Sequence, residues 1–463
     1  MSGTGPMQRL NRAALGLPAP AASRRIVHIG IGAFARAHLV WYTARASDAA
    51  DWAISAFTGR SPELAELLAP QDGLYTLIER GPSGSSYEVL AAIDEVIAAD
   101  RVDLLVARVA DPATALISLT ITEAGYLLLP DGSPDPEAAA LRDDLALLRV
   151  ALNGAPTPPR TPLCRLLLAL DARRRTGGGA IALVPCDNVP GNGGFLRRGL
   201  LELAAAGSSD LAAWLTTSAS FVSTSVDRIT PRLTGTETVE VAAATGWEDA
   251  APVVTEPYAD WVLEGDFPAG RPDWESAGAR FVDDVHPYES RKLWLLNGAH
   301  TLLACSGLLR GHSSVAEAVG DPDCLALVEA FWDECARQLP AELHADEYRR
   351  ALLARFRNPG IQHALEQVGQ DTLTKLRARL APIARAELAA GRDARATAAG
   401  VAAWIALVRR GDAPRDAEAE RIRAAAGPRD LIALIDPALA ADPPFAGAVE
   451  EALNTDERLV HGS

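Results

Sequence analysis

Arg25-Ile-Val-His-Ile-Gly30-Ile-Gly32-Ala-Phe34-Ala35 is the stretch that decides the fold of this 463-residue chain. Its first half is a short β-branched run, which is typical of a buried strand. Gly30, Gly32 and Ala35 then form a G-x-G-x-x-A pattern. The first glycine permits a tight turn, and the second lets the backbone approach a pyrophosphate. The small third residue lets the next helix pack on the strand, and the N-terminus of that helix favours phosphate. The stretch therefore predicts a dinucleotide-binding βα unit; the alternative is a tight turn without a ligand.

Strand-like and helix-like segments alternate through the first 284 residues. Strands are expected at 25–30, 52–57, 104–109, 115–121, 181–184 and 219–225, and helices at 62–68 and 136–153. Such alternation is typical of a parallel sheet with crossover helices, whose ligands bind at the carboxyl ends of the strands. Polar residues follow two of the later strands, Asp187-Asn188 after one and Asp227-Arg228 after the other. We therefore expect chemistry at these strand ends.

Strand-like runs stop near residue 284, and helices rich in Ala, Leu, Arg and Glu follow. We expect helices at 289–309, 321–338, 345–355, 361–380, 381–390 and 395–410, and a peripheral tail after Pro443. The sequence thus predicts an α/β protein with a Rossmann-type N-terminal domain at residues 1–284. A mostly α-helical C-terminal domain at 285–463 is expected to hold the substrate and the catalytic residues.

Composition narrows the classes of partner. The net charge of −16 disfavours nucleic acid and anionic membranes, because both require concentrated basic surface. The five cysteines are scattered and show no metal-ligand spacing, which indicates reduced thiols in a cytoplasmic protein and no metal. No apolar run is long enough to span a membrane, and the first 24 residues lack the apolar core of a signal peptide. We expect a monomer or a weak oligomer.

Lysine is nearly absent from the chain. Of the 44 basic residues, only Lys292 and Lys375 are lysines. Arginine stays protonated in proteins, whereas burial can tune a lysine to release its proton near neutral pH. Lys292 lies in Glu289-Ser-Arg-Lys-Leu-Trp-Leu-Leu-Asn-Gly-Ala-His300, a segment dense in acid–base and hydrogen-bonding groups. It is therefore the first candidate for a catalytic base; the alternative is that two lysines survived by chance.

Residues 289–300 would gather their polar side chains if they formed one α-helix. With Lys292 at 0°, Glu289 falls at about 60°, His300 at about 80° and Asn297 at about 140°. A polar sector in an otherwise apolar segment predicts a helix face that lines a pocket. The alternative is a solvated stripe with an ordinary Glu–Lys pair.

The end of the second strand bears on the choice of cofactor. An acidic residue that would bind the ribose hydroxyls is missing there, and the sequence reads Phe57-Thr58-Gly59-Arg60. Because an arginine can accept a 2′-phosphate, both NAD and NADP stay open. Arg60 is equally compatible with a solvated loop charge.

Seven motifs follow one another between residues 25 and 410. They are Gly30-x-Gly32-x-Phe34-x-Arg36-Ala37-His38, Gln71-Asp72-Gly73-Leu-Tyr75-Thr76, Thr120-x-Thr122-Glu123-x-Gly125-Tyr126, Cys186-Asp187-Asn188-x-Pro190-x-Asn192-Gly193, Ser225-Val-Asp227-Arg228-Ile, the K-x-x-x-x-N-x-x-H pattern of Lys292, Asn297 and His300, and Arg355-Phe-x-Asn358-Pro359. Together they resemble the mannitol dehydrogenase family of long-chain polyol dehydrogenases. The resemblance implies a metal-independent oxidoreductase that transfers hydride between NAD and a CH–OH group, with NADP left open.

The resemblance also implies roles for the residues around the lysine. Lys292 would be the general base that takes the hydroxyl proton as hydride leaves for the nicotinamide. Asn297 and Asn188 would donate hydrogen bonds to the developing alkoxide, and His300 would orient the substrate hydroxyls. Glu289 would pass the proton on to solvent.

Further roles concern the surroundings of the lysine, the substrate and the cofactor. Asp227 would help to set the polar environment of the lysine, and Lys375 would hold the far end of the substrate. The expected cofactor-binding residues are Gly30, Gly32, Phe34, Arg36 and Arg60.

Departures from the family pattern affect the expected substrate. Asp371-Thr372-Leu373-Thr374 precedes Lys375 where relatives often have Asp-Gly-Ser, and residues 362–367 contain no arginine. Glu366 would repel a substrate carboxylate. These features favour a linear polyol and its ketose, such as mannitol and fructose, over a hexuronate.

Two alternatives stay open. One is a fructuronate reductase, that is, a D-mannonate oxidoreductase, whose carboxylate site would come from Arg36, Arg355 and Arg357. The other is a non-catalytic dinucleotide-binding sensor that kept the fold and lost the chemistry.

Overall fold

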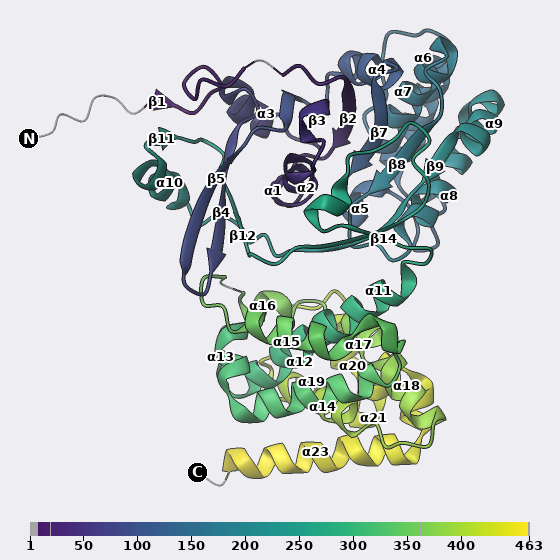
Figure 1. Ribbon diagram of the computed structural model, residues 1–463. Coiled ribbons are helices and arrows are strands. Elements are labelled where there is room, and N and C mark those ends of the chain that lie inside the picture. Colours follow the sequence, from purple (N-terminus) through teal and green to yellow (C-terminus); the bar gives the residue numbers. More distant parts are fainter. Residues whose placement is uncertain (1–7, 19, 362, 462–463) are drawn as a thin grey trace, which may run out of the picture. The chain divides into compact units, whose positions relative to one another are not determined.

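The computed structural model describes residues 8–18, 20–361 and 363–461, with side chains described through residue 455. The chain divides into two compact units, Met1–Val285 and His286–Ser463. The first unit contains a parallel sheet with crossover helices, and the second is built from helices (Figure 1). The fold class predicted from the sequence is confirmed.

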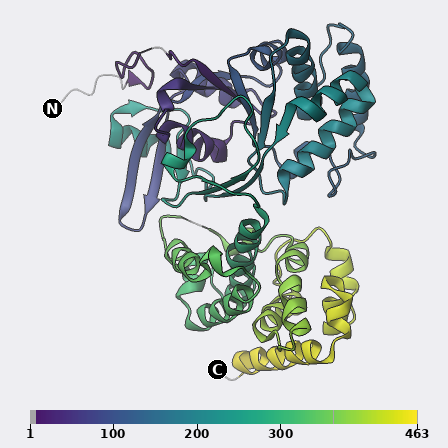
Figure 2. The same cartoon turned by 45° about the vertical axis from the view of Figure 1, so that its right-hand side comes forward.

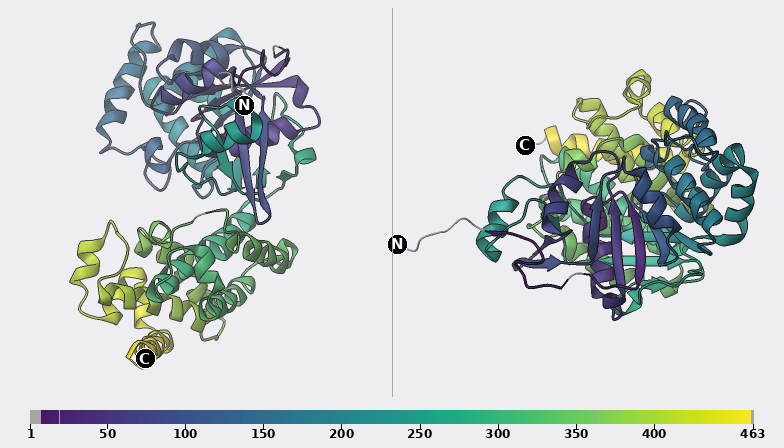
Figure 3. Two further views of the ribbon diagram at one scale, coloured as in Figure 1. Left: turned by 90° about the vertical axis from the view of Figure 1, so that its left-hand side faces the viewer. Right: turned by 90° about the horizontal axis from the view of Figure 1, so that it is seen from above.

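A six-stranded sheet forms the centre of the first unit. Its strands, from edge to edge, are β6 (Ile93–Ile97), β3 (Trp52–Phe57), β2 (Arg24–Ile29), β7 (Thr114–Leu119), β8 (Ile181–Pro185) and β9 (Ala219–Phe221). All neighbours pair in parallel (Figure 3). In chain order this is the 3-2-1-4-5-6 arrangement of doubly wound dinucleotide-binding sheets. The order reverses between β2 and β7, so the glycine-rich loop after β2 lies at the switch point, where such sheets bind their ligands.

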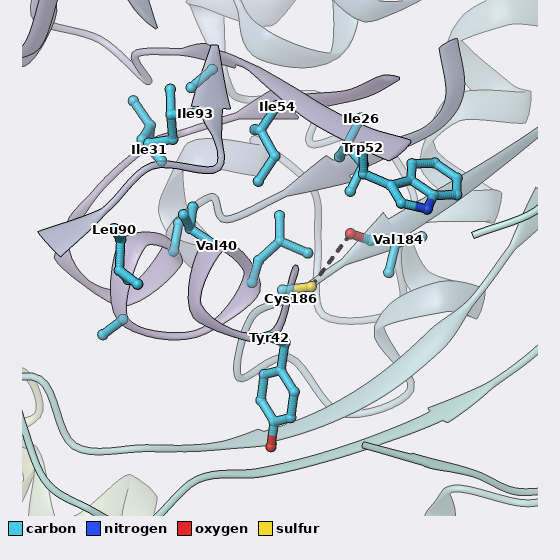
Figure 4. Packing of buried hydrophobic residues seen from close by; sticks show 14 of the residues in the cluster. Ile26, Ile31, Val40, Tyr42, Trp52, Ile54, Leu90, Ile93, Val184 and Cys186 are labelled. Atoms are coloured by element: carbon cyan, nitrogen blue, oxygen red, sulfur yellow. Dashed lines mark hydrogen bonds between the residues drawn. The ribbon is translucent and has the colours of Figure 1, made fainter. Parts of the chain in front are cut away.

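Burial on both faces explains why the strands read as continuous apolar runs. Every residue of β3 and of β7 is buried. Figure 4 shows Ile26, Ile54 and Val184, from three strands, in one cluster with Val40 and Tyr42 of α2 (Leu39–Arg45). Ile26 pairs directly with Ile54 across the sheet.

The strand predicted at 104–109 is wrong. This segment belongs to helix α4 (Val102–Ala110), which buries Val102, Leu105 and Val109. Spacings of three and four residues place these side chains on one face of a helix. A short apolar run does not distinguish a buried strand from a buried helix face.

The remaining helices of this unit surround the sheet and its loops. They are α1 (Ala33–Ala37), α3 (Glu63–Leu68), α5 (Glu123–Tyr126), α6 (Ala139–Ala151), α7 (Pro162–Thr176), α8 (Asn192–Gly207), α9 (Ser209–Ser218) and α10 (Glu237–Thr245).

Three smaller sheets complete the first unit. A hairpin of β4 (Tyr75–Gly81) and β5 (Gly84–Leu90) pairs with β12 (Val253–Thr255). β10 (Ser223–Asp227) pairs with β13 (Asp260–Glu264), which also pairs with β14 (Arg280–Phe281). The two-residue strands β1 (Gln8–Arg9) and β11 (Trp247–Glu248) pair with each other. The single strand predicted at 219–225 is therefore two strands, because β9 and β10 belong to different sheets.

The second unit is organised around α12 (Ala299–Leu309), in which Ala299 to Gly307 are all buried. Preceding it are α11 (His286–Arg291) and the π-helix η4 (Lys292–Gly298). The other helices are α13 (Val315–Gly320), α14 (Pro322–Ala336), α15 (Ala345–Phe356), α16 (Leu365–Val368), α17 (Thr372–Arg379), α18 (Ala381–Ala389), α19 (Arg395–Arg410), α20 (Ala419–Ala424), α21 (Pro428–Ile435), α22 (Pro437–Ala441) and α23 (Pro443–His461). The helices predicted at 289–309 and 361–380 are each divided into shorter ones.

The tail after Pro443 is not peripheral, contrary to the prediction. It forms α23, the yellow helix of Figure 2, which packs against α19. Phe445 and Val449 are completely buried. The last helix is therefore part of the core of the second unit.

Candidate active site

The loop after β2 has the geometry that the glycine pattern predicts. Gly30 has a φ of +97°, and a Cβ there would lie 2.2 Å from the carbonyl oxygen of Thr120, which follows β7. Glycine is therefore required where this loop leaves the sheet. A Cβ at Gly32 would meet no atom closer than 3.8 Å. The space beside Gly32 lets a ligand approach the backbone, so the loop fits a dinucleotide pyrophosphate.

Arg36 and Phe34 support this loop from the protein side. Arg36 is buried, donates from Nε to the Gly32 carbonyl at 3.3 Å and lies over the Tyr75 ring. Burial lowers its pKa to about 10, although Tyr75 and Asp249 oppose the shift. Phe34 stacks on His38 with ring centroids 4.9 Å apart. Arg36 therefore holds the Gly32 carbonyl of the glycine-rich loop.

Arg60 follows β3 and is exposed, whereas Thr58 is buried and accepts a hydrogen bond from the Ala99 amide. The Gly59 carbonyl between them accepts from Arg165 at 3.1 Å. The loop is thus fixed by buried contacts, and Arg60 extends from it into solvent.

The half-buried Asp187 follows β8, at a strand end where the sequence predicted polar residues. Asp187 accepts hydrogen bonds from the Tyr126 hydroxyl, from the Val189 amide and from the Asn192 side chain. Burial raises its pKa, and these hydrogen bonds oppose the rise. Asn188, the predicted oxyanion donor, is the exposed next residue. Asp187 therefore fixes the turn that presents Asn188, and its position after a strand was the available signal.

Asp227 is the last residue of β10 and is buried. Its register partner across the sheet is Asp260, which accepts an ion-pairing hydrogen bond from Arg280. β10 therefore ends in a buried carboxyl group, at a strand end where the sequence predicted polar residues.

In the second unit, Glu289 lies on α11 directly before the predicted base. Its carboxylate is 3.0 Å from Nδ1 of His286, one turn earlier on the same helix. Glu289 is only partly buried, and His286 is exposed. His286 therefore lies on the solvent side of Glu289.

Lys292 and Asn297 stand on the π-helix η4, and the continuous α-helix assumed at 289–300 is wrong over these residues. In a π-helix the backbone hydrogen bond joins residues i and i+5, so each residue turns through less than 100°. Both side chains are half-buried. The angles assigned from the sequence do not apply here, and the two residues lie roughly one turn apart.

His300 follows on α12 and is 8% exposed. Its ring lies 4.8 Å from the Phe356 ring and 4.8 Å, edge to face, from the ring of His363. Nε2 of His300 is buried and has no hydrogen-bond partner among the described residues. A buried polar atom without a partner is costly, and a substrate hydroxyl would satisfy it.

Positive charge gathers around His300. Burial lowers its pKa well below the ordinary value, and His363, Arg355, Arg379 and Lys375 lower it further. Burial also lowers the pKa of His363, and the positive charges of Arg355 and Lys375 lower it further. Both imidazoles are therefore held in the neutral form, in which a ring nitrogen can accept a hydrogen bond.

Lys375 and Arg379 lie four residues apart on α17, a spacing that puts two side chains on one helix face. Burial lowers the pKa of Arg379 to about 10. Burial also lowers the pKa of Lys375, and the positive charge of Arg379 lowers it further. Asp371 and Asp416 oppose the shift. Like charges at this spacing destabilise a helix. Both charges are held by hydrogen bonds to the protein: Lys375 donates to the carbonyls of Val368 and Gln370, and Arg379 donates to the Asn297 carbonyl and the Thr301 hydroxyl.

In the second unit, His363, Arg355, Arg379 and Lys375 act on His300. Lys292 and Asn297 lie on the helical segment directly before it. Arg379 and His363 were not predicted from the sequence. The repeat of a cation four residues after Lys375 was the signal for Arg379. His363 lies beside Gln362, which is outside the described residues, in the stretch that was noted for its missing arginine.

Neither a membrane-spanning helix nor a metal-binding cluster is found among the described residues. No helix there combines the length and the apolar character needed to cross a bilayer. Across residues 8–461 with their gaps, no three His, Cys, Asp or Glu side chains are grouped to hold a metal ion. The five cysteines are buried and unpaired.

Comparison with known proteins gave matches over most of the chain. The family model described as Mannitol dehydrogenase Rossmann domain matches residues 24–276, and the one described as Mannitol dehydrogenase C-terminal domain matches residues 284–430. D-mannonate oxidoreductase of Escherichia coli (strain K12) is 35% identical over 392 residues, which are 82% of this chain and 79% of that protein. D-arabinitol 4-dehydrogenase of Ralstonia nicotianae is 37% identical over 388 residues, 81% of this chain and 80% of that protein.

One solved structure is similar over nearly its whole length. It is the Pseudomonas fluorescens mannitol 2-dehydrogenase in a ternary complex with NAD and D-mannitol, with a TM-score of 0.79 and 31% identity. The match covers 99% of this chain and 95% of that one.

Proposed function

The chain belongs to the mannitol dehydrogenase family of oxidoreductases, and on this premise we propose that it transfers hydride between NAD(P) and the secondary alcohol of a linear polyol of the mannitol type. The product would be the corresponding ketose. The observation that carries the proposal is the set Lys292, Asn297 and His300 on one helical segment, with Nε2 of His300 buried and lacking a partner among the described atoms.

Each residue has a chemical role in this proposal. In alcohol oxidation, neutral Lys292 accepts the hydroxyl proton. A nicotinamide cofactor, when bound, would supply the acceptor for the hydride that leaves the carbon bearing this hydroxyl. Asn297 and Asn188 donate hydrogen bonds to the oxygen as it gains negative charge. His300 accepts from a neighbouring substrate hydroxyl. Glu289 carries the proton from the lysine toward solvent.

The first unit supports cofactor binding through its own residues. The space beside Gly32 receives the pyrophosphate, and Arg36 holds the Gly32 carbonyl in place. The end of β3 lacks an acid for the ribose hydroxyls and offers the exposed Arg60. We propose NAD as the cofactor and retain NADP as the alternative that Arg60 allows.

A hexuronate is the second candidate substrate, and a specific observation favours it. Arg355, Lys375 and Arg379 all act on His300 as positive charges. Glu366, which the sequence suggested would repel a carboxylate, is exposed, and the charges that act on nearby His363 are both positive. Under this reading the enzyme is a D-mannonate oxidoreductase, and the positive charges bind the carboxylate of the sugar acid.

A panel of substrates tests the proposal. The purified protein is assayed at 340 nm with mannitol, arabinitol, fructose, mannonate and fructuronate, each with NAD(H) and NADP(H). Turnover of polyols or ketoses supports the first candidate, and turnover of uronates alone selects the second. Cofactor binding without turnover of any substrate would favour a dinucleotide-binding sensor.

Lys292 variants test the base assignment. Lys292→Ala should lower kcat by about 100- to 10,000-fold, the usual contribution of a general acid–base group. Lys292→Arg is the matched control for charge. It should bind NAD(H) normally, measured by quenching of tryptophan fluorescence, yet turn over poorly because a guanidinium keeps its proton. Full turnover by Lys292→Ala would refute the assignment.

A further inference from the structure

The π-helix that carries Lys292 and Asn297 needs a physical cause. Seven residues, Lys292–Gly298, adopt it between the α-helices α11 and α12. π-helices are rare and are concentrated at functional sites. The segment combines leucines, which are strong helix formers, with Asn297 and Gly298, which are weak ones, and such propensities do not by themselves favour a π-helix over an α-helix. The register must therefore be set by contacts from other elements.

Trp332 of α14 supplies one such contact. Its side chain is completely buried, and the indole Nε1–H donates to the main-chain carbonyl of Leu295 at 2.7 Å. In a regular helix this carbonyl accepts from the helix's own backbone, so a donor from another helix competes with the α-helical register. A buried indole N–H requires a partner, which makes the bond costly to lose.

Phe331, the residue before Trp332, supplies the second contact. A Cβ placed on Gly298 would lie 2.7 Å from Cε1 of the Phe331 ring. Real Cβ atoms do not approach this closely, so glycine at the end of η4 is what lets α14 lie against it. α14 therefore contacts the π-helix at Leu295 and again at Gly298.

Arg379 of α17 holds the helix at a second carbonyl. Its guanidinium donates to the carbonyl of Asn297 at 3.0 Å and to the hydroxyl of Thr301 at 2.9 Å. The Thr301 hydroxyl also donates to the Asn297 carbonyl at 3.1 Å. Two carbonyls of the π-helix are thus held by side chains.

The register has a consequence for the two polar side chains. In an α-helix, five residues turn through about 500°, which would place Asn297 about 140° away from Lys292. In a π-helix the hydrogen bond itself links positions i and i+5, so residues 292 and 297 fall on nearly the same side. The wider turn therefore brings the base and the alkoxide donor to one face.

We propose that α14 clamps Lys292–Gly298 in the π-helical register and that Trp332 is the positioning residue of this clamp. Trp332 acts through the Leu295 carbonyl and sets the relative placement of Lys292 and Asn297. Its ring also stacks at 6.3 Å on Phe356, which contacts His300. The catalytic consequence rests on the proposed function, whereas the clamp itself does not.

Trp332→Phe tests the clamp, because it removes the N–H and keeps an aromatic ring. Trp404→Phe is the matched control, since Trp404 is 1% exposed on α19 of the same unit. Hydrogen exchange of a peptide covering residues 292–298, followed by mass spectrometry, should speed up about tenfold or more in Trp332→Phe and stay unchanged in the control. Equal exchange in both variants would overturn the proposal.

Kinetics give the second readout. In Trp332→Phe, kcat should fall by about 10- to 100-fold, as expected for a displacement near 1 Å, while KM changes by less than about threefold. The apparent pKa of the base in the pH profile of kcat/KM should also move. If Trp332→Phe loses no more activity than Trp404→Phe and its pH profile is unchanged, Trp332 contributes only to packing and does not position Lys292 and Asn297.

Gly298→Ala gives an independent test through rescue. The added Cβ meets Phe331, so exchange over residues 292–298 should increase, and Phe331→Leu in the same chain should restore it by making room. Absence of rescue would overturn the role of α14. If the wild-type protein turns over none of the panel substrates, the proposed function fails, and the exchange experiments still decide the clamp.

Discussion

At the scale of the residue, the two lysines of the sequence lie in different surroundings. Lys292 begins the π-helix, whereas Lys375 on α17 donates to the carbonyls of Val368 and Gln370. An ammonium group has three donors, so Lys375 keeps one for a ligand. Burial and Arg379 lower its pKa, and a nearby anion would oppose this shift by stabilising the charged form. Lys375 is therefore the residue at which the two candidate substrates should differ most.

Replacing Lys375 by methionine keeps the length of the side chain and removes the charge. If the substrate is a sugar acid, KM for mannonate should rise about 10- to 100-fold, the value of one charged hydrogen bond, while KM for mannitol changes little. Steady-state kinetics with both substrates measure the difference. Lys375→Arg is the control that keeps the charge. Equal changes in KM for both substrates would show that Lys375 does not bind the substrate carboxylate.

At the scale of the element, α14 serves two other helices. Trp332 contacts η4, and Glu334, two residues later, accepts hydrogen bonds from the amides of Ala396 and Thr397 and from the Thr397 hydroxyl. These amides open α19, so a buried carboxylate from another helix satisfies its N-terminus. Burial raises the pKa of Glu334. The hydrogen bonds oppose that rise and hold α19 against α14.

Glu334→Ala should destabilise the protein by about 3 kcal/mol, because it leaves buried N–H groups without an acceptor and opens a cavity. Glu334→Gln is the matched control, since its amide oxygen can still accept from the same groups, and it should lose about 1 kcal/mol. Urea-induced unfolding followed by circular dichroism measures both values. Equal losses would mean that the negative charge of the carboxylate, which neither variant keeps, sets the effect, and not the side-chain volume or the acceptor oxygen that glutamine retains.

Patterning along the chain predicted most elements, and the exceptions have a local cause. Residues 104–109 and 219–225 are short apolar runs. Such a run is compatible with either a strand or a buried helix face, and its composition does not indicate where one sheet ends and another begins. The π-helix is a different case. Its residues range from strong helix formers such as leucine to weak ones such as Gly298, a mixture that does not predict a π-helix. Its register depends on donors from α14 and α17 that are distant in the sequence.

At the scale of the whole molecule, His28 links global stability to pH. It lies in β2, with Nδ1 2.8 Å from the Ser118 hydroxyl of β7, and burial lowers its pKa to about 4. The unfolded chain, with a pKa near 6.5, therefore takes up the proton first. The stability contribution is complete above about pH 6.5 and is lost as the pH falls toward 4.

The expected loss from this one residue between pH 7 and pH 5 is about 2 kcal/mol. His28→Asn, which can still donate to Ser118 and does not titrate, should show a pH dependence of the unfolding free energy that is smaller by this amount. Urea unfolding at the two pH values measures it. A variant whose unfolding free energy keeps the wild-type pH dependence would disprove the role of His28.

The sequence by itself determined the doubly wound sheet, the glycine loop after β2, the helical second unit and the candidate set Lys292, Asn297 and His300. These features depend on residues that are close in the sequence, because the spacing of apolar and small residues over a short stretch determines a buried strand, a tight turn or a helix face. Tertiary structure alone decided the π-helical register and the positive charges around His300. Arg355, His363 and Arg379 come from separate segments of the chain. Packing between helices places them beside His300, and this packing cannot be predicted from the spacing of neighbouring residues.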